Sequence, residues 1–356
     1  MGKEMTPRER VEKVLRKEGA DRIPFTIYEG LMPRSTVERQ LRNEGLCLIS
    51  GISVFRMHLL DVKEHSDGFY KDGVWHERWY WETPFGILTS LRVPKGFTLW
   101  TKEKMFKSKE DYKAVAFLIK NRVYEPAYDE FLKTGEEKGS DYFCTTGIGY
   151  EPLQELIIGI MGVETFCIEW AERRDEVLKL YDLLVEERRK IYKIVAESPA
   201  LYVGYGGNVS PEIIGPERFR KYFVPNYNEA AEILHKYGKL IGVHFDANNK
   251  LFAPYVAKTE LDCIEAFTPP PDCDMSVKEA LDIWPDKILW INFPSSVHCA
   301  EEYVIRQTME GILKEAGTGE RLIVGITEDV PSEHYRKSMT TISRVLIEKG
   351  KIPLSL

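Results

Sequence analysis

The chain has 356 residues, 43% of them hydrophobic, and its 49 basic and 56 acidic residues give a formal net charge of -7. This acidic balance, without a basic cluster, argues against a nucleic-acid partner. The charged opening segment lacks the apolar core of a signal peptide, and no apolar run approaches the roughly 20 residues that span a bilayer. We therefore expect a cytoplasmic protein that does not bind membranes.

Six cysteines are scattered singly, without a Cys-x-x-Cys pair. This spacing indicates neither a disulfide framework nor a zinc ribbon, so the thiols are expected to be reduced. The length alone would suggest two or three domains, but single barrels are routinely this long.

A helix and a strand are the first predicted elements. The helix begins at Thr6, because Pro7 stands at the first helical position and Glu9 completes a capping box. The apolar run 23–30 predicts the first strand with its exit loop. Tyr28 and Glu29 lie at that exit and are candidate site residues, although Glu29 can equally be a solvated loop residue.

Residues 69–97 have a different sequence pattern, in which glycines separate runs of aromatic and β-branched residues. This pattern is typical of an antiparallel hairpin, which we interpret as an insertion in a single barrel domain comprising residues 1–356.

From about residue 140 onward, short apolar runs alternate with helical stretches, including 151–161, 174–197 and 217–237. Alternation of this kind predicts βα units and one parallel sheet, either closed or open.

The run from Lys239 to Val243 is the most informative strand, because it ends on His244 and Asp246. Residues two apart in a strand point to the same side, so these two side chains would project together as metal ligands or proton carriers. A hydrogen-bonded orienting pair or a polar loop start is the alternative interpretation.

The following strands also end in polar groups, namely Glu265, Asn292 and then Glu328 with Asp329. In a closed barrel these ends converge on one mouth, where active sites of such barrels lie. Ionised groups there cost solvation energy unless they are paired or bound to a metal.

Several segments resemble the uroporphyrinogen decarboxylase-like superfamily, and within it the corrinoid-dependent zinc methyltransferases. They are TPRERV at 6–11, DRIP at 21–24, WETPFG at 81–86, PERFRKYFVP at 216–225, GKLIGVHFD at 238–246 and ITEDVP at 326–331. Their order spans nearly the whole chain. The resemblance implies a (β/α)8 TIM barrel with its site at the carboxyl mouth.

The resemblance also implies a metal site with altered ligands. The methyltransferases hold zinc through His-x-Cys after one strand and Cys after the last. Here His244 matches the His, Asp246 stands at the first Cys and Glu328 at the second. Carboxylates are competent zinc ligands, and three protein ligands with one open position are typical of a catalytic site. Glu265 is the substitute ligand if Asp246 does not contact the metal.

Two carboxylates make a harder site than two thiolates and favour an oxygen donor. The expected activity is therefore demethylation of a small O-methyl substrate, with the methyl group passed to a corrinoid (cobalamin). The chain lacks an Asp-x-His-x-x-Gly signature, so the corrinoid would be carried by a partner protein. An oligomer is compatible with this interpretation.

Two other functions remain as alternatives, a decarboxylase-like lyase and a catalytically inactive barrel subunit. Decarboxylases of the superfamily carry an arginine-rich loop after the first strand, where this chain has Glu29. Tyr28, Glu29, Tyr150, Asn208 and Asn292 are the candidate substrate-binding residues. His298 and Cys299 have no partner at ligand spacing and are not predicted to bind metal.

Overall fold

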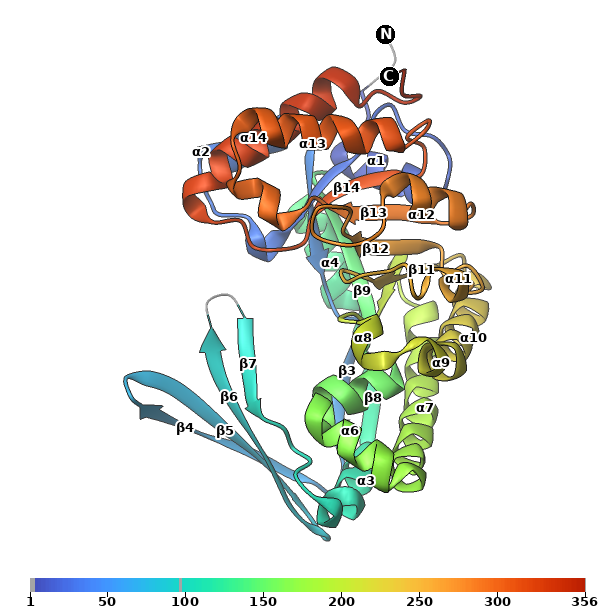
Figure 1. The fold of residues 1–356 in the computed structure, drawn as a ribbon. Coiled ribbons are helices and arrows are strands. Elements are labelled where there is room, and N and C mark those ends of the chain that lie inside the picture. Colours follow the sequence, from blue (N-terminus) through green and yellow to red (C-terminus); the bar gives the residue numbers. More distant parts are fainter. Residues whose placement is uncertain (1–3, 96–97, 356) are drawn as a thin grey trace. The chain divides into compact units, whose positions relative to one another are not determined.

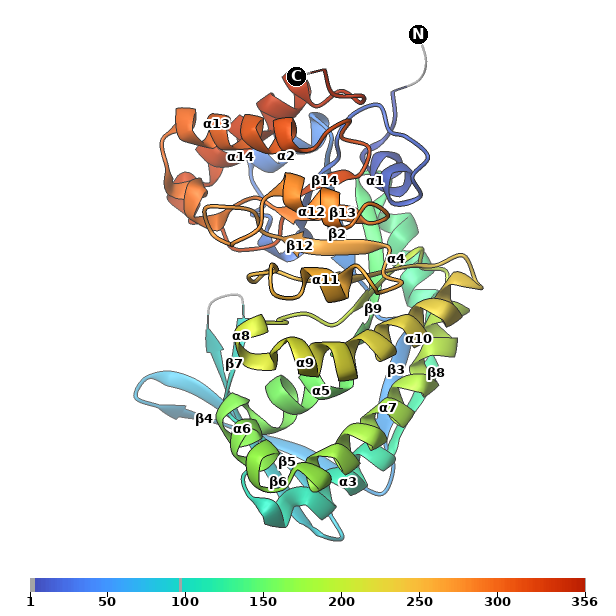
Figure 2. The ribbon, with the colours of Figure 1, turned by 45° about the vertical axis from the view of Figure 1, so that its right-hand side comes forward.

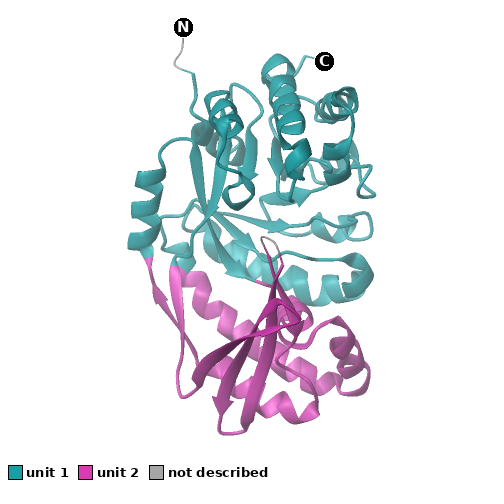
Figure 3. Cartoon of the chain, turned by 90° about the vertical axis from the view of Figure 1, so that its left-hand side faces the viewer, with its two compact units in different colours: residues 1–54, 128–149, 195–356 teal, residues 55–127, 150–194 magenta. Residues whose placement is uncertain are grey.

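The computed structural model describes residues 4–95 and 98–355, which form two compact units (Figure 3). One unit draws on residues 1–54, 128–149 and 195–356, and the other on residues 55–127 and 150–194. Within the described residues, none of the helices has both the length and the apolar character needed to cross a membrane.

The first unit contains a closed parallel barrel, built in the described part of the chain from eight strands. They are β1 (Phe25–Tyr28), β2 (Leu46–Gly51), β9 (Tyr142–Gly149), β10 (Tyr202–Tyr205), β11 (Leu240–His244), β12 (Cys263–Phe267), β13 (Ile288–Asn292) and β14 (Leu322–Ile326). Around the ring the order is β1, β14, β13, β12, β11, β10, β9 and β2, and β1 pairs in parallel with both β2 and β14. The predicted TIM-barrel fold is confirmed.

Helices connect these strands (Figures 1 and 2). They are α1 (Pro7–Leu15), α2 (Thr36–Asn43), α4 (Tyr128–Lys138), α8 (Pro211–Ile214), α9 (Pro216–Arg218), α10 (Val224–His235), α11 (Ala253–Val256), α12 (Val277–Ile283), α13 (Glu302–Glu315) and α14 (Ser332–Lys349). α14 packs against both α13 and α2. The predicted capping box at the start of α1 is present, since Thr6 and Glu9 exchange hydrogen bonds of 2.7 and 3.2 Å.

Large side chains fill the barrel interior. Trp290 on β13 donates from Nε1 to Oγ1 of Thr26 on β1 at 2.9 Å, and its ring lies 5.7 Å from that of Tyr202 and 6.5 Å from that of Phe143. Gly325 on β14 leaves space for the Trp290 indole, because a Cβ atom at this position would lie 3.0 Å from Trp290 Nε1. The barrel interior is therefore a packed core in which the Thr26 hydroxyl is paired with the Trp290 indole.

The second unit contains two antiparallel sheets. β3 (Phe55–Leu59) pairs with β8 (Arg122–Pro126). The larger sheet has the order β4 (Lys63–Lys71), β5 (Val74–Thr83), β6 (Gly86–Lys95) and β7 (Thr98–Glu103). Its helices are α3 (Tyr112–Lys120), α5 (Pro152–Gln154), α6 (Val163–Glu172) and α7 (Arg174–Ala196).

The antiparallel hairpin is thus present, but it begins earlier and ends later than the predicted 69–97, of which 96–97 lie outside the described residues. Strand β4 is polar and exposed along its whole length. It has no apolar alternation by which to recognise it. A single domain for residues 1–356 stays a prediction.

Candidate metal centre

His244 and Glu265 face one another because their strands are in register. β11 and β12 are parallel neighbours, with His244 opposite Glu265, and the Phe245 N–H donates to the Glu265 carbonyl at 2.8 Å. The two side chains consequently meet, with Nδ1 of the imidazole 2.7 Å from Oε2 of the carboxylate. His244 is the last residue of β11, but Glu265 is the third of the five residues of β12 and does not lie at the strand end where the sequence analysis expected it.

Tyr28 completes this group from the end of β1. Its hydroxyl donates to Oε1 of Glu265 at 2.5 Å and lies 3.1 Å from Nδ1 of His244. Glu265 thus accepts on both carboxylate oxygens, one contact fixing the phenol and the other the imidazole. With Nδ1 engaged in this way, Nε2 is the nitrogen that remains for a ligand.

Two further carboxylates lie close to this imidazole. Asp246 Oδ2 is 3.5 Å from Nε2 of His244. Among the described residues, His244, Asp246 and Glu328 each offer one ligand atom, and these atoms lie within 4.8 Å of one another. Three separate positions beyond β11 and β14 therefore converge as a candidate metal site.

Buried hydrogen bonds hold the loops that carry these carboxylates. After β14, the Thr327 N–H donates to Oδ1 of Asn292 at 2.9 Å, which fixes the backbone just before Glu328. After β11, the side-chain amide of Asn249 donates to the Phe245 and Ala247 carbonyls at 3.2 and 2.8 Å, so the turn around Asp246 is closed on itself.

Gly207, in the loop after β10, packs against the imidazole. A Cβ atom at this position would lie 3.3 Å from Cβ and 3.6 Å from Cδ2 of His244. The absence of a side chain therefore allows the loop to support one side of the ring. The next residue, Asn208, has a left-handed backbone with φ of 54°, which asparagine tolerates better than most residues.

The charges of the site are strongly coupled. Burial opposes a charge on His244, but Glu265 and Asp246 outweigh it and raise the pKa of the imidazole to about 10. Burial and the charges of Asp246 and Glu265 raise the pKa of Glu328. Carboxylates crowded around one cationic ring indicate a site whose negative charge suits a cation.

The structure also shows what surrounds the remaining candidate residues. Glu29 pairs with Lys138 of α4 and accepts from Ser50 Oγ at 2.8 Å. Asn292 is 1% exposed, and its amide donates to Thr268 Oγ1 at 3.4 Å. Tyr150 belongs to the unit containing residues 150–194. A substrate contact by these residues, and by Asn208, stays a prediction.

Sequence reasoning missed the supporting contacts. The pair Gly206-Gly207 was a signal for close backbone approach, but nothing in the sequence identified His244 as the neighbour. Cys273 was missed as well. Its Sγ lies 3.3 Å from the Asp246 carbonyl, so the loop after β12 also braces the turn that carries Asp246.

Comparison with known proteins supports the fold. No protein-family model and no curated protein matches the chain. Among solved structures, it is similar to a methyltransferase from Methanosarcina mazei, with a TM-score of 0.58, 11% identity and coverage of 96% of this chain and 99% of that one. At this identity the similarity shows the fold alone.

Two glycoside hydrolases are less similar. An endoglucanase from an uncultured bacterium has a TM-score of 0.38 and 8% identity, covering 67% of this chain and 78% of its own. A pneumococcal exo-β-D-N-acetylglucosaminidase has the same TM-score and identity, covering 90% of this chain and 83% of its own. Neither similarity is close enough to bear on function.

Proposed function

We propose that the protein is a zinc-dependent methyltransferase that removes a methyl group from a small O-methyl substrate and passes it to a corrinoid protein. The observation that carries the proposal is the convergence of His244, Asp246 and Glu328, whose ligand atoms lie within 4.8 Å of one another. The similar barrel of a Methanosarcina mazei methyltransferase supports the reaction class.

The candidate ligands match a zinc site in their number and chemical type, and Glu265 holds the imidazole in place. One imidazole and two carboxylates are three ligands of the kinds that zinc accepts, at about 2.0–2.2 Å, and catalytic sites add one open position. Metal-bound histidines characteristically have a carboxylate on the other ring nitrogen. Glu265 occupies that place, which favours Asp246 over Glu265 as the third ligand.

The chain's own residues fix the position of the His244 imidazole. Glu265 and Tyr28 together fix the imidazole plane, while Gly207 backs the ring so that it cannot tilt away. Two carboxylate ligands make the site hard, which suits an oxygen donor better than sulfur. Zinc held here supplies Lewis-acid polarisation of the donor oxygen, so that this oxygen becomes a better leaving group.

The proposed acceptor is the reduced cobalt of a corrinoid carried by a separate protein. With such a corrinoid docked, the carbon–oxygen bond of the substrate would break as the methyl carbon bonds to the nucleophile, and the oxygen would keep the electron pair and take a proton from water. The protein contributes placement and charge, and the corrinoid contributes the nucleophile.

Metal analysis of protein purified without chelator tests the first part of the proposal. We expect about one zinc per chain, as one three-residue ligand group implies. His244→Ala and Glu328→Ala should each lose it while retaining the circular dichroism spectrum of the folded chain. Glu29→Gln is the matched control, because this carboxylate pairs with Lys138. Wild-type protein without zinc would contradict the proposal and favour a lyase or an inactive subunit.

Turnover of Co(I) corrinoid protein, followed spectroscopically, tests the methyl transfer. A methoxylated aromatic, a simple alcohol and a methylated amine serve as competing donors. The proposal expects the oxygen donors to react and the reaction to disappear in Glu328→Ala. Zinc-loaded protein that methylates cobalt from none of them would refute the assigned chemistry while leaving the metal site intact.

A further inference from the structure

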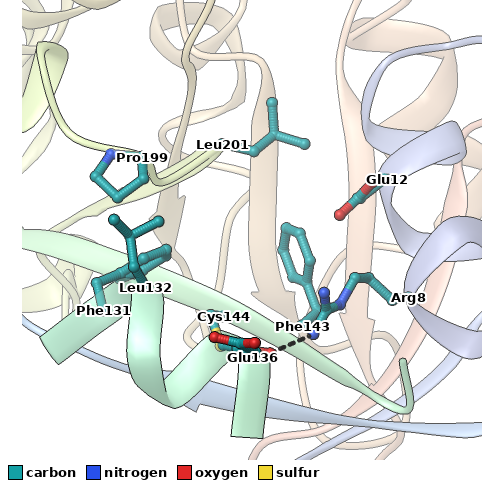
Figure 4. Close-up of a pocket in the computed structure, with 10 residues that line it drawn as sticks. Arg8, Glu12, Phe131, Leu132, Glu136, Phe143, Cys144, Pro199 and Leu201 are labelled. Carbon is teal, nitrogen blue, oxygen red and sulfur yellow. Dashed lines mark hydrogen bonds between the residues drawn. The ribbon is translucent and has the colours of Figure 1, made fainter. Parts of the chain in front are cut away.

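A second cavity lies at the other end of the barrel from His244. It has a volume of about 300 Å³, and Figure 4 shows the side chains around it. The lining residues come from α1, α4, β9 and the segment before β10, and they are Arg8, Glu12, Phe131, Leu132, Gly135, Glu136, Phe143, Cys144, Pro199 and Leu201. Phe143 is the second residue of β9, whereas His244 is the last residue of β11, so the cavity is separate from the candidate metal centre.

Most of the cavity wall is apolar. The Phe143 ring faces Leu132 and Pro199 across the space, with Leu201 between them (Figure 4). Leu132, at the rim, is 56% exposed. Burial raises the pKa of the Cys144 thiol, which keeps it neutral and part of the apolar wall. The walls therefore suit the apolar body of a small molecule.

Glu12 gives the cavity a negative charge that the protein leaves without a hydrogen bond. Within residues 4–95 and 98–355, no group hydrogen-bonds its carboxylate, which lies beside the Phe143 ring (Figure 4). Partial burial raises the pKa of Glu12, with Arg8 and Arg16 acting in the opposite direction. A half-buried carboxylate without a hydrogen-bond donor is the type of group that the N–H groups of a bound ammonium ion would satisfy.

Arg8 places a positive charge near Glu12, but its guanidinium donates hydrogen bonds to carbonyl groups and none to the Glu12 carboxylate. Nε donates to the Tyr142 carbonyl at 2.7 Å, and Nη2 donates to the carbonyls of Gly135 and Gly139. These contacts tie the end of α4 to α1. Arg8 thus serves as a structural link, and the second acidic residue of the lining, Glu136, adds a negative charge at the rim.

We propose that this cavity binds a small organic ammonium ion, with the cationic head at the Glu12 carboxylate and an apolar body against Phe143, Leu132 and Leu201. The Phe143 ring strengthens the interaction, since an aromatic face attracts a cation. Two carboxylates, one of them exposed, are too few ligands for a hard metal ion. The two carboxylates of Glu12 and Glu136 outweigh the single positive charge of Arg8 in the lining, so the cavity favours a cation over an anion. The volume is at the lower end for ligand sites, so the molecule carries one ring or a short chain.

Calorimetric titration of the full chain with three probes of equal size tests this proposal. Benzylammonium should bind with one site per chain, and benzyl alcohol and benzoate should bind at least about tenfold more weakly. Glu12→Gln should lower the benzylammonium affinity by about tenfold. Glu137→Gln on α4, an exposed glutamate outside the lining, should leave it unchanged. Equal binding of benzyl alcohol, or no binding of benzylammonium, would overturn the proposal.

Modification of cysteine by N-ethylmaleimide gives the position of the bound probe without any substitution. Benzylammonium should slow the reaction of Cys144 and leave that of Cys299, which is exposed and outside the cavity, unchanged in peptide mass spectra. Binding that does not protect Cys144 would place the probe elsewhere and refute this site, whether or not Glu12→Gln folds.

Discussion

Nδ1 of His244 lies 2.7 Å from Oε2 of Glu265, while Asp246 approaches the opposite nitrogen, with Oδ2 3.5 Å from Nε2. The two carboxylates therefore have different places around one ring. Asp246 lies beside Nε2, where it and the imidazole could bind the same metal ion. Glu265 lies beside Nδ1, where it orients the imidazole. This difference in position agrees with the order in which the sequence analysis ranked the two residues, with Asp246 as the expected ligand and Glu265 as its substitute.

Replacing Glu265 by Gln should weaken zinc binding without removing the site. The amide keeps a hydrogen-bond acceptor for Tyr28 but loses the charge that supports the imidazole. We expect zinc affinity, measured by competition with a chromophoric chelator, to fall by about 10- to 100-fold. Full zinc occupancy should return at high metal concentration, in contrast to Glu328→Ala. Unchanged affinity in Glu265→Gln would show that Glu265 does not support the ligand.

Gly207→Ala should displace the His244 side chain by steric contact, without changing any charge or hydrogen-bonding group. The added methyl group would lie 3.3 Å from His244 Cβ, closer than ordinary van der Waals contact, so the ring or the loop must shift by a few tenths of an ångström. Zinc affinity should fall measurably, since metal ligation tolerates only small displacements. Gly30→Ala is the control, because a Cβ atom there meets nothing within 4 Å. An equal response of both variants would contradict this explanation.

Asn292→Leu should destabilise the fold and loosen the loop that carries Glu328. The Thr327 N–H, 2.9 Å from Oδ1 of Asn292, would be left buried without its acceptor. Such a loss costs about 1–3 kcal/mol, which denaturant unfolding of metal-free protein would measure. Thr268→Val removes the 3.4 Å contact with Asn292 and the 3.1 Å hydrogen bond from the Thr268 hydroxyl to the Ala266 carbonyl, but it leaves the Thr327 N–H paired and should cost less. A smaller effect for Asn292→Leu than for Thr268→Val would count against this role.

The buried His298 should make the protein sensitive to acid. Burial lowers the pKa of His298 to about 4, with Asp272 opposing the shift, and Nδ1 lies 2.5 Å from Ser338 Oγ. Because the folded pKa lies below the ordinary value near 6.5, the unfolded chain binds this proton more readily. The stabilisation is fully present above pH 6.5 and is lost as the pH falls from 6.5 towards 4, by about 3 kcal/mol in total.

Unfolding free energies of wild type and His298→Asn at pH 7.5, 5.5 and 4.5 measure this effect. The wild type should lose stability more steeply than the variant over this range, and the difference between the two curves isolates His298 from the carboxylates. Parallel curves would show that His298 does not carry a shifted pKa.

The barrel and the convergence of ligands were predictable because they follow from local patterns. Apolar runs followed by polar residues identified β11 and β14, and closure of a parallel sheet brings such strand ends together. The place of Glu265 was not predictable, since it depends on the register between β11 and β12. The sequence contains no signal for a register between strands separated by a helix.

The boundaries of the antiparallel sheet were harder to predict for another reason. Strand β4 exposes all of its residues and has no apolar face, so no alternation distinguishes it from a loop. Its pairing with the aromatic strand β5 defines it, and cross-strand pairing is a tertiary property.

The pairing of β1 with β14 means that the first strand finds one of its two neighbours only at the end of the chain. The final strand also leads directly into the loop with Glu328. During synthesis, therefore, a nascent chain cannot close its ring, or bring Glu328 close to His244 and Asp246, until β14 and the loop after it have left the ribosome.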